Sequence, residues 1–206
     1  MGRLVARVVG VGVALAMAVA GLAGCGGAGS SGGDGPTATV PTVPPDPFAV
    51  PPVIDEAYVN RVLAALDQAD GDVLRMVVST KTIPPEVIER LKALYVGEEL
   101  LQLQVDVLQS DLFNRLDGYK PVPGNKRTNV TRLITARPSC IFAEVSRDFS
   151  EVAVSPDPRL AKQWIGLVPM DSTLDRRAYN RTTWIYIYEG FPNDGSEPED
   201  PCAKVS

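Results

Sequence analysis

Residues Thr182–Tyr188 read TTWIYIY, and every residue in this stretch is β-branched or aromatic. Such side chains suit a pleated, half-buried surface, so this stretch is predicted to be the strongest strand of the chain. A period of two would place Trp184, Tyr186 and Tyr188 on one face of that strand. These aromatic residues are a candidate ligand or partner face, and the alternative is that they pack inward beneath a helix.

Four stretches that precede this strand show the same character. Lys126 to Ala136 is predicted to be a strand, Ile141 to Arg147 and Val152 to Val154 alternate apolar and polar residues, and Trp164 to Val168 is apolar. The connections between these stretches are short and typical of hairpins. The sequence therefore predicts a mostly antiparallel sheet of four to five strands.

The chain before Tyr119 follows the helical period instead. Apolar residues spaced by three and four predict a helix over about residues 54–68, ended by Asp70-Gly71, and a second over about 72–80. A third, long helix is predicted to start at Pro85 and to end at Asp117-Gly118, because proline suits a first turn and glycine a helix end. Three helices followed by strands predict an α+β fold, with the helices on one face of the sheet.

This order of elements over residues 53–191 is similar to the nuclear transport factor 2-like fold. In that fold, three N-terminal helices close a cone against a curved antiparallel sheet. The resemblance is one of topology and rests on no sequence motif. Members of that superfamily include dehydratases, isomerases, polyketide cyclases and non-catalytic accessory domains. The resemblance therefore does not by itself choose a function.

The N-terminus is predicted to contain an export signal. Arg3 and Arg7 precede an uncharged apolar run from Val8 to Ala20, which is too short to span a membrane but typical of a signal peptide. The next motif, Leu22-Ala23-Gly24-Cys25, resembles the bacterial lipobox. The resemblance implies cleavage between Gly24 and Cys25 and lipidation of Cys25 with palmitate-type acyl chains. The alternatives are an ordinary secretory signal and an uncleaved anchor.

The remaining sequence divides into a tether and a domain. Residues 25–52 are expected to form a lipidated Gly- and Pro-rich tether after the 1–24 signal peptide, and the alternative is a proline motif that binds a partner. Residues 53–206 are expected to form one α+β domain with an acidic tail. Because export leads to an oxidising compartment, Cys140 and Cys202 are expected to form a disulfide that holds this tail, the alternative being two free thiols.

The composition excludes several chemistries. The chain contains no histidine, so it has no Ser-His-Asp or Cys-His triad and lacks the commonest metal ligand. No phosphate-binding glycine loop or calcium loop occurs, and we expect no metal and no cofactor. The net charge of -5 argues against nucleic acid as a partner.

Carboxylate chemistry remains open. The candidate acidic residues, for which the alternative is an ordinary solvated position, are Asp55, Glu56, Asp67, Asp106 and Glu144. The sequence favours a lipid-anchored binding or accessory protein of the cell envelope, on the extracytoplasmic face of the membrane and without catalysis. Its expected partners are the membrane, through the lipid on Cys25, and an envelope protein or a small apolar ligand. The alternatives are a carboxylate/tyrosine isomerase, dehydratase or cyclase, and a structural spacer in an envelope complex.

Overall fold

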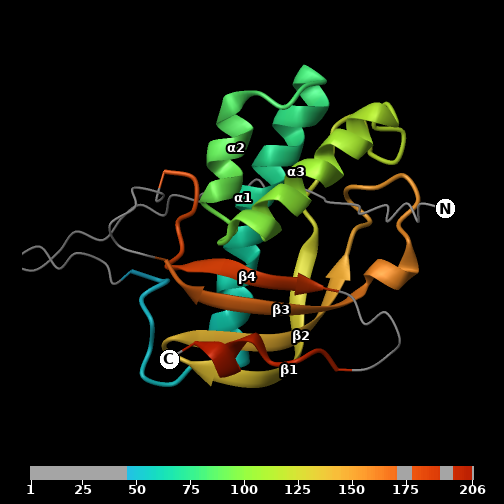
Figure 1. The fold of residues 1–206 in the computed structure, drawn as a ribbon. Coiled ribbons are helices and arrows are strands. Elements are labelled where there is room, and N and C mark those ends of the chain that lie inside the picture. The colour runs from blue at the N-terminus through green and yellow to red at the C-terminus, as the bar shows by residue number, and fades with distance from the viewer. Residues whose placement is uncertain (1–45, 171–177, 191–196, 206) are drawn as a thin grey trace, which may run out of the picture.

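The computed structural model describes residues 46–170, 178–190 and 197–205. The expected signal peptide, the lipobox with Cys25 and most of the expected tether lie outside the described residues. Within them, three α-helices are followed by a four-stranded antiparallel sheet (Figure 1). The α+β class and the order of helices before strands agree with the prediction from the sequence.

The first helix, α1, spans Glu56–Thr80 and joins the two helices that were predicted over residues 54–68 and 72–80. The predicted helix end at Asp70-Gly71 is wrong. Both residues are buried against the rest of the fold, so tertiary packing outweighs the local preference of aspartate and glycine for a helix end.

The long third helix predicted from Pro85 is also wrong, because the chain forms two helices there. Helix α2 spans Pro85–Lys92 and α3 spans Glu98–Phe113. Between them, the Val96 N–H donates to the Tyr186 carbonyl at 2.9 Å, so this backbone extends the edge of the sheet. Gly97 then adopts a φ of 84°, which interrupts the helix.

The sheet is a meander in which each strand pairs antiparallel with the next. The predicted strand over Val152 to Val154 is wrong, since only Ala153 makes an isolated bridge, to Tyr119. The four strands are β1 (Arg127–Arg137), β2 (Cys140–Asp148), β3 (Lys162–Pro169) and β4 (Trp184–Gly190).

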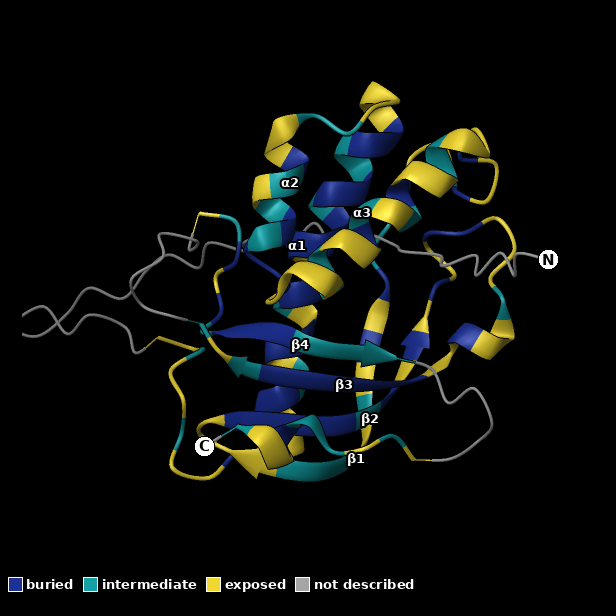
Figure 2. Cartoon of the chain, viewed as in Figure 1, coloured by how far each residue is buried: buried dark blue, intermediate teal, exposed yellow. Residues whose placement is uncertain are grey.

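The two faces of the sheet carry separate apolar clusters. The larger cluster joins all three helices to one face, which includes Ile141, Ala143 and Val145 of β2. The smaller cluster, around Phe142 and Trp164, lies on the other face. Figure 1 shows α1 behind the strands and the C-terminal segment in front of them, and Figure 2 shows that α3 has far more exposed residues than α1.

The aromatic residues of β4 do not share one face, so this prediction is wrong. The register with β3 shifts between Gly166 and Leu167, whose partners are Tyr188 and Tyr186. The extra residue between those two tyrosines reverses the alternation, as a β-bulge does. Trp184 and Tyr186 are therefore fully buried on the helix side, whereas Tyr188 packs with Phe142 on the opposite face.

A disulfide holds the C-terminal segment on the face of the sheet that the helices leave uncovered. Cys140, at the start of β2, is bonded to Cys202, in the short 3-10 turn Pro201–Lys204, with their Cα atoms 5.6 Å apart. Asp200 accepts hydrogen bonds from the Cys202 N–H at 2.8 Å and from the Thr135 hydroxyl at 2.6 Å. The end of the chain is thereby part of the fold.

Candidate functional site

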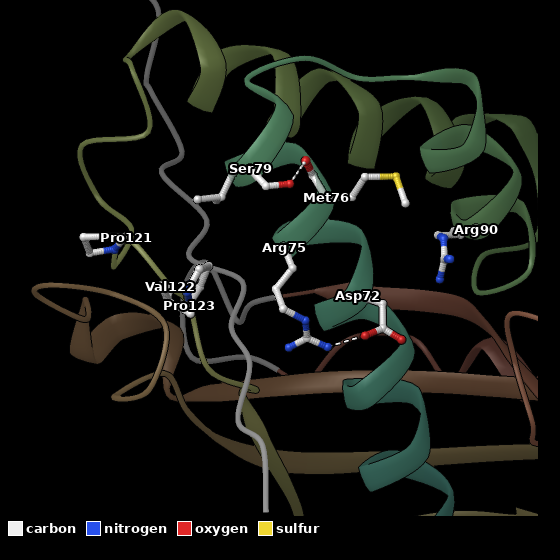
Figure 3. Close-up of a pocket in the computed structure, with 9 residues that line it drawn as sticks. Asp72, Arg75, Met76, Ser79, Arg90, Pro121, Val122 and Pro123 are labelled. Carbon is white, nitrogen blue, oxygen red and sulfur yellow. Dashed lines mark hydrogen bonds and ion pairs between the residues drawn. The ribbon is translucent and has the colours of Figure 1, made fainter.

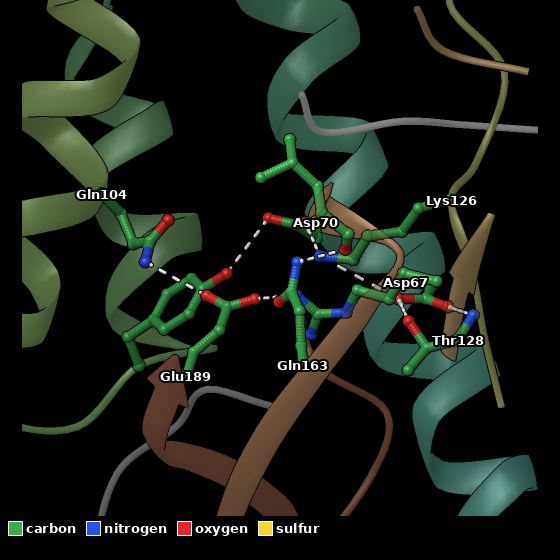
Figure 4. Close-up of polar contacts among 10 residues, drawn as sticks. Asp67, Asp70, Gln104, Lys126, Thr128, Gln163 and Glu189 are labelled. Carbon is green, nitrogen blue, oxygen red and sulfur yellow. Dashed lines mark hydrogen bonds and ion pairs between the residues drawn. The ribbon is translucent and has the colours of Figure 1, made fainter. Parts of the chain in front are cut away.

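A cluster of charged side chains is buried between α1 and the helix-facing side of the sheet (Figure 4). Three carboxylates, Asp67, Asp70 and Glu189, face two cations, Lys126 and Arg147, and we call these five residues the interior cluster. Each of their side chains is at most 5% exposed. Burying a charge is costly unless it is paired, so the contacts inside the cluster determine what it can do.

Two of the carboxylates share Lys126, which directly precedes β1. The Lys126 ammonium donates to Asp70 and lies 3.9 Å from Asp67. Asp67 also accepts from the Thr128 N–H at 2.7 Å and from the Thr128 hydroxyl at 2.9 Å. The second oxygen of Asp70 accepts from the Tyr95 hydroxyl at 3.4 Å. Each carboxylate therefore has a cation and a neutral donor beside it.

Arg147 of β2 pairs with the third carboxylate. Its Nη1 donates to Glu189 of β4 and to the side-chain carbonyl of Gln163. The other oxygen of Glu189 accepts from Gln104 of α3 at 3.2 Å, which connects α3 to the cluster. Arg147 Nε and Nη2 and the Tyr186 hydroxyl are buried and have no hydrogen-bond partner among the described residues. The cluster thus has donors that its own carboxylates do not use.

Burial also changes the acidity of these groups. Desolvation raises the pKa of Asp67 to about 6, although Lys126 and Arg147 act in the opposite direction. Burial alone would lower the pKa of Arg147, but Glu189 holds that pKa above its ordinary value, so the guanidinium stays charged. Burial raises the pKa of Tyr95 and Tyr186 well above 10, so both keep their protons at neutral pH.

The raised pKa of Asp67 predicts that the protein becomes more stable as the pH falls from about 7.5 to about 5. The folded pKa of about 6 exceeds the ordinary aspartate value of 3.8, so the folded state binds this proton more tightly and the stabilisation is lost as the pH rises through 6. Asp67 is expected to contribute about 1 kcal/mol to this gain in the free energy of unfolding. Urea unfolding at both pH values measures it.

The variant Asp67→Asn is the control, because its amide has nearly the same shape and does not titrate. We expect the pH dependence to flatten in this variant. Burial also raises the pKa of Asp111 to about 6, so this residue accounts for the pH dependence of stability that remains in the variant. Hydrogen bonds from Ser150 and Arg159 lower the pKa of Asp148 and Asp157. The stability that these two carboxylates contribute is therefore lost only in stronger acid, and measurements above pH 5 avoid it. An unchanged slope in Asp67→Asn would contradict this assignment.

The sequence identified only part of this cluster. The sequence offers Asp67 as a candidate carboxylate, but it places Asp70 at a helix end and singles out neither Arg147 nor Glu189. The alternation in β2 contains the missing signal, because a period of two places Arg147 on the same face as the buried Val145. A charged residue that shares a strand face with buried apolar residues indicates a buried ion pair.

The other candidate carboxylates lie elsewhere and in ordinary environments. Asp55 caps α1 by accepting from the Tyr58 N–H at 2.7 Å, and the neighbouring Glu56 is exposed. Asp106 is exposed on α3 and accepts from Gln102 at 2.7 Å. The remaining one, Glu144, lies on the sheet face away from the helices and pairs with Lys162 at 3.2 Å and with Arg132 at 3.4 Å.

A groove of about 590 Å³ opens on the surface beside the C-terminal half of α1, and we call it the α1 groove. Its floor is one face of α1, where lining residues recur at spacings of three and four. Figure 3 shows Arg90 of α2 on one side of this face and the segment Pro121–Pro123 on the other. The residues that line the groove are Asp72, Arg75, Met76, Val78, Ser79, Arg90, Pro121, Val122 and Pro123.

Two arginines give the α1 groove its charge. Arg75 Nη2 donates to Asp72, while Arg75 Nη1 has no hydrogen-bond partner among the described residues. Arg90 donates to Glu86 at 2.7 and 3.0 Å and lies over the ring of Tyr179 at 4.7 Å. The Arg75 and Arg90 side chains are 27% and 22% exposed, so both are partly accessible at the surface, although Arg75 Nη1 itself is buried.

Among the described residues, no three His, Cys, Asp or Glu side chains are grouped so that they could hold a metal ion. Within the same ranges, no helix has both the length and the apolar composition needed to cross a bilayer. Comparison with known proteins finds no matching family model, no similar curated protein and no similar solved structure. The function is therefore inferred from the interior cluster and the α1 groove themselves.

Proposed function

We propose that this protein is a lipid-anchored binding or accessory protein on the extracytoplasmic face of a bacterial cell membrane and that it is not an enzyme. The observation that carries the proposal is the contrast between its two sites. Each carboxylate of the interior cluster has a cation beside it, and every side chain of the cluster is nearly inaccessible. The α1 groove is open and has the size of small-molecule sites, about 300–1,000 Å³.

Anchoring is supported by the lipobox-like motif Leu22-Ala23-Gly24-Cys25 and by the Gly- and Pro-rich residues that follow it. Two acyl chains hold a protein on a membrane where one is marginal. The disulfide between Cys140 and Cys202 supports an oxidising compartment outside the cytoplasm. The envelope location makes a membrane-associated partner or ligand the most accessible one.

The variant Cys25→Ser is expected to lose its membrane anchor. Serine is not alkylated by diacylglycerol under the conditions that modify a cysteine thiolate, so both palmitate labelling and sedimentation with membranes should disappear. Labelled palmitate followed by fractionation measures both. Unchanged labelling or unchanged membrane association would contradict lipidation at Cys25.

We also propose that the domain has the nuclear transport factor 2-like fold. Three helices precede an antiparallel sheet and all pack on one of its faces, which supports this topology. In such a cone the interior cluster would lie in the interior, where isomerases with that fold use a buried aspartate together with a tyrosine. Here that position is occupied by the protein's own paired charges, which supports an accessory domain over an enzyme.

Site-specific photo-crosslinking in living cells tests the binding function. A photoreactive residue at Ser79, which is exposed in the α1 groove, is compared with one at Asp106, which is exposed on α3. We expect a discrete adduct from position 79 that disappears in Met76→Trp, because the larger side chain fills the groove. Equal adducts from both positions, or none from position 79, would overturn the proposal and favour a structural spacer.

One observation favours the carboxylate/tyrosine enzyme as a second candidate. Asp67 has a pKa of about 6, and unpartnered donors of Arg147 and Tyr186 lie in the same buried region. A carboxylate near neutrality can exchange a proton, and such donors can stabilise a developing oxyanion. This chemistry requires α3 to move, because its Gln104 covers the cluster through Glu189.

A further inference from the structure

We propose that the α1 groove binds a long-chain fatty acid, with the carboxylate at Arg75 and Arg90 and the acyl chain along the apolar lining. This inference rests on the proposed binding function and specifies its ligand. Two properties of the groove support it: the apolar lining and the two arginine side chains that line it.

The lining suits a hydrocarbon chain. Five of the nine lining residues are apolar, and they provide aliphatic or ring carbon: Met76, Val78, Pro121, Val122 and Pro123. No aromatic ring is among the described lining residues, so the groove lacks the flat surface on which a sugar ring stacks. An apolar chain gains free energy from burial there without needing any hydrogen-bond partner.

The walls argue against an extended peptide. An extended peptide that adds to a protein as a further strand derives affinity from main-chain hydrogen bonds to an exposed strand edge. The floor of this groove is the helix α1, whose backbone groups are paired within the helix. Pro121 and Pro123 on one wall have no N–H to donate. A ligand with polar groups only at one end fits these walls better.

The charge of the groove specifies the polar end of the ligand. The chain carries a net charge of -5, yet Arg75 and Arg90 both line this groove, and Asp72 is the one acidic residue among the described lining residues. Asp72 occupies only Nη2 of Arg75, and Glu86 accepts from Arg90 through Nε and Nη2. Arg75 Nη1 is buried and has no hydrogen-bond partner among the described residues, so a carboxylate that reached it would accept a charge-assisted hydrogen bond of the stronger kind.

Calorimetric titration with oleate tests the inference. The protein is the whole chain that follows the expected cleavage, with Cys25→Ser, so that no acyl chain of its own competes for the groove. We expect saturable binding of one oleate, weakened about tenfold or more by Arg75→Gln and abolished by Met76→Trp. The matched control Arg61→Gln removes an exposed arginine of the same helix outside the groove and should leave binding unchanged.

Oleyl alcohol separates the chain from the charge, because it has the same hydrocarbon without the carboxylate. It should bind about tenfold more weakly than oleate and show no loss in Arg75→Gln. No binding of oleate, or binding that persists in Met76→Trp, would overturn the inference. A groove adduct at position 79 without oleate binding would leave the binding function standing with a different ligand.

Discussion

Replacing Arg147 with methionine is expected to lower the free energy of unfolding by about 3–5 kcal/mol, because it leaves the buried Glu189 without its cation. Both side chains are at most 5% exposed, so water cannot compensate for the lost partner. Denaturant unfolding followed by the fluorescence of the buried Trp164 and Trp184 measures the loss. This is the largest effect that we expect from any single substitution in the interior cluster.

The double variant Arg147→Met, Glu189→Met shows whether the pair itself stabilises the fold. Replacing a buried ion pair with apolar side chains of similar volume is often neutral or stabilising, so most of the loss should be recovered. The matched surface control is Arg159→Met, which removes an 87% exposed cation from Asp157 and should leave the free energy of unfolding almost unchanged. A loss in Arg147→Met no greater than in this control would show that Glu189 is not buried with Arg147.

Removing the disulfide with Cys140→Ala and Cys202→Ala is expected to lower the free energy of unfolding by about 4 kcal/mol. The two cysteines are 62 residues apart, and closing a loop of that length restricts the unfolded chain by about this amount. Thermal unfolding of the two proteins, with and without a reducing agent, measures the difference.

The reducing agent provides the internal control for the disulfide. It should destabilise the unmodified protein and leave the double alanine variant unchanged. The variant should also become sensitive to proteolysis near residues 197–205, because only hydrogen bonds such as that from Asp200 to Thr135 then hold this segment. Equal stability of the two proteins would mean that the bond does not constrain the fold.

The sequence predicted the elements of the fold better than their ends. The strand at TTWIYIY, the hairpins before it and the α+β class follow from local periodicity, and the structure confirms them. The helix boundaries at Asp70 and Gly97 depend on contacts far away in the chain. Asp70 stays helical because it is buried and pairs with Lys126, and the break at Gly97 follows a segment that pairs with β4.

The candidate site was harder to predict for the same reason. Asp67 is among the candidate carboxylates of the sequence, but its pairing with Lys126 joins residues far apart in the chain. The bulge in β4 could not be read from a sequence that alternates regularly, and it is what separates Tyr188 from Trp184 and Tyr186. The α1 groove depends on how Pro121–Pro123 lie against α1, which local patterns do not show.

The most direct test asks which of the two sites binds, by combining the groove crosslink at position 79 with changes in each site. In the double variant Arg147→Met, Glu189→Met, the interior cluster loses a cation and a carboxylate while the α1 groove is untouched. We predict an unchanged adduct in this variant and no adduct in Met76→Trp. Loss of the adduct in the double variant while that protein remains folded, or its persistence in Met76→Trp, would contradict the assignment of binding to the groove.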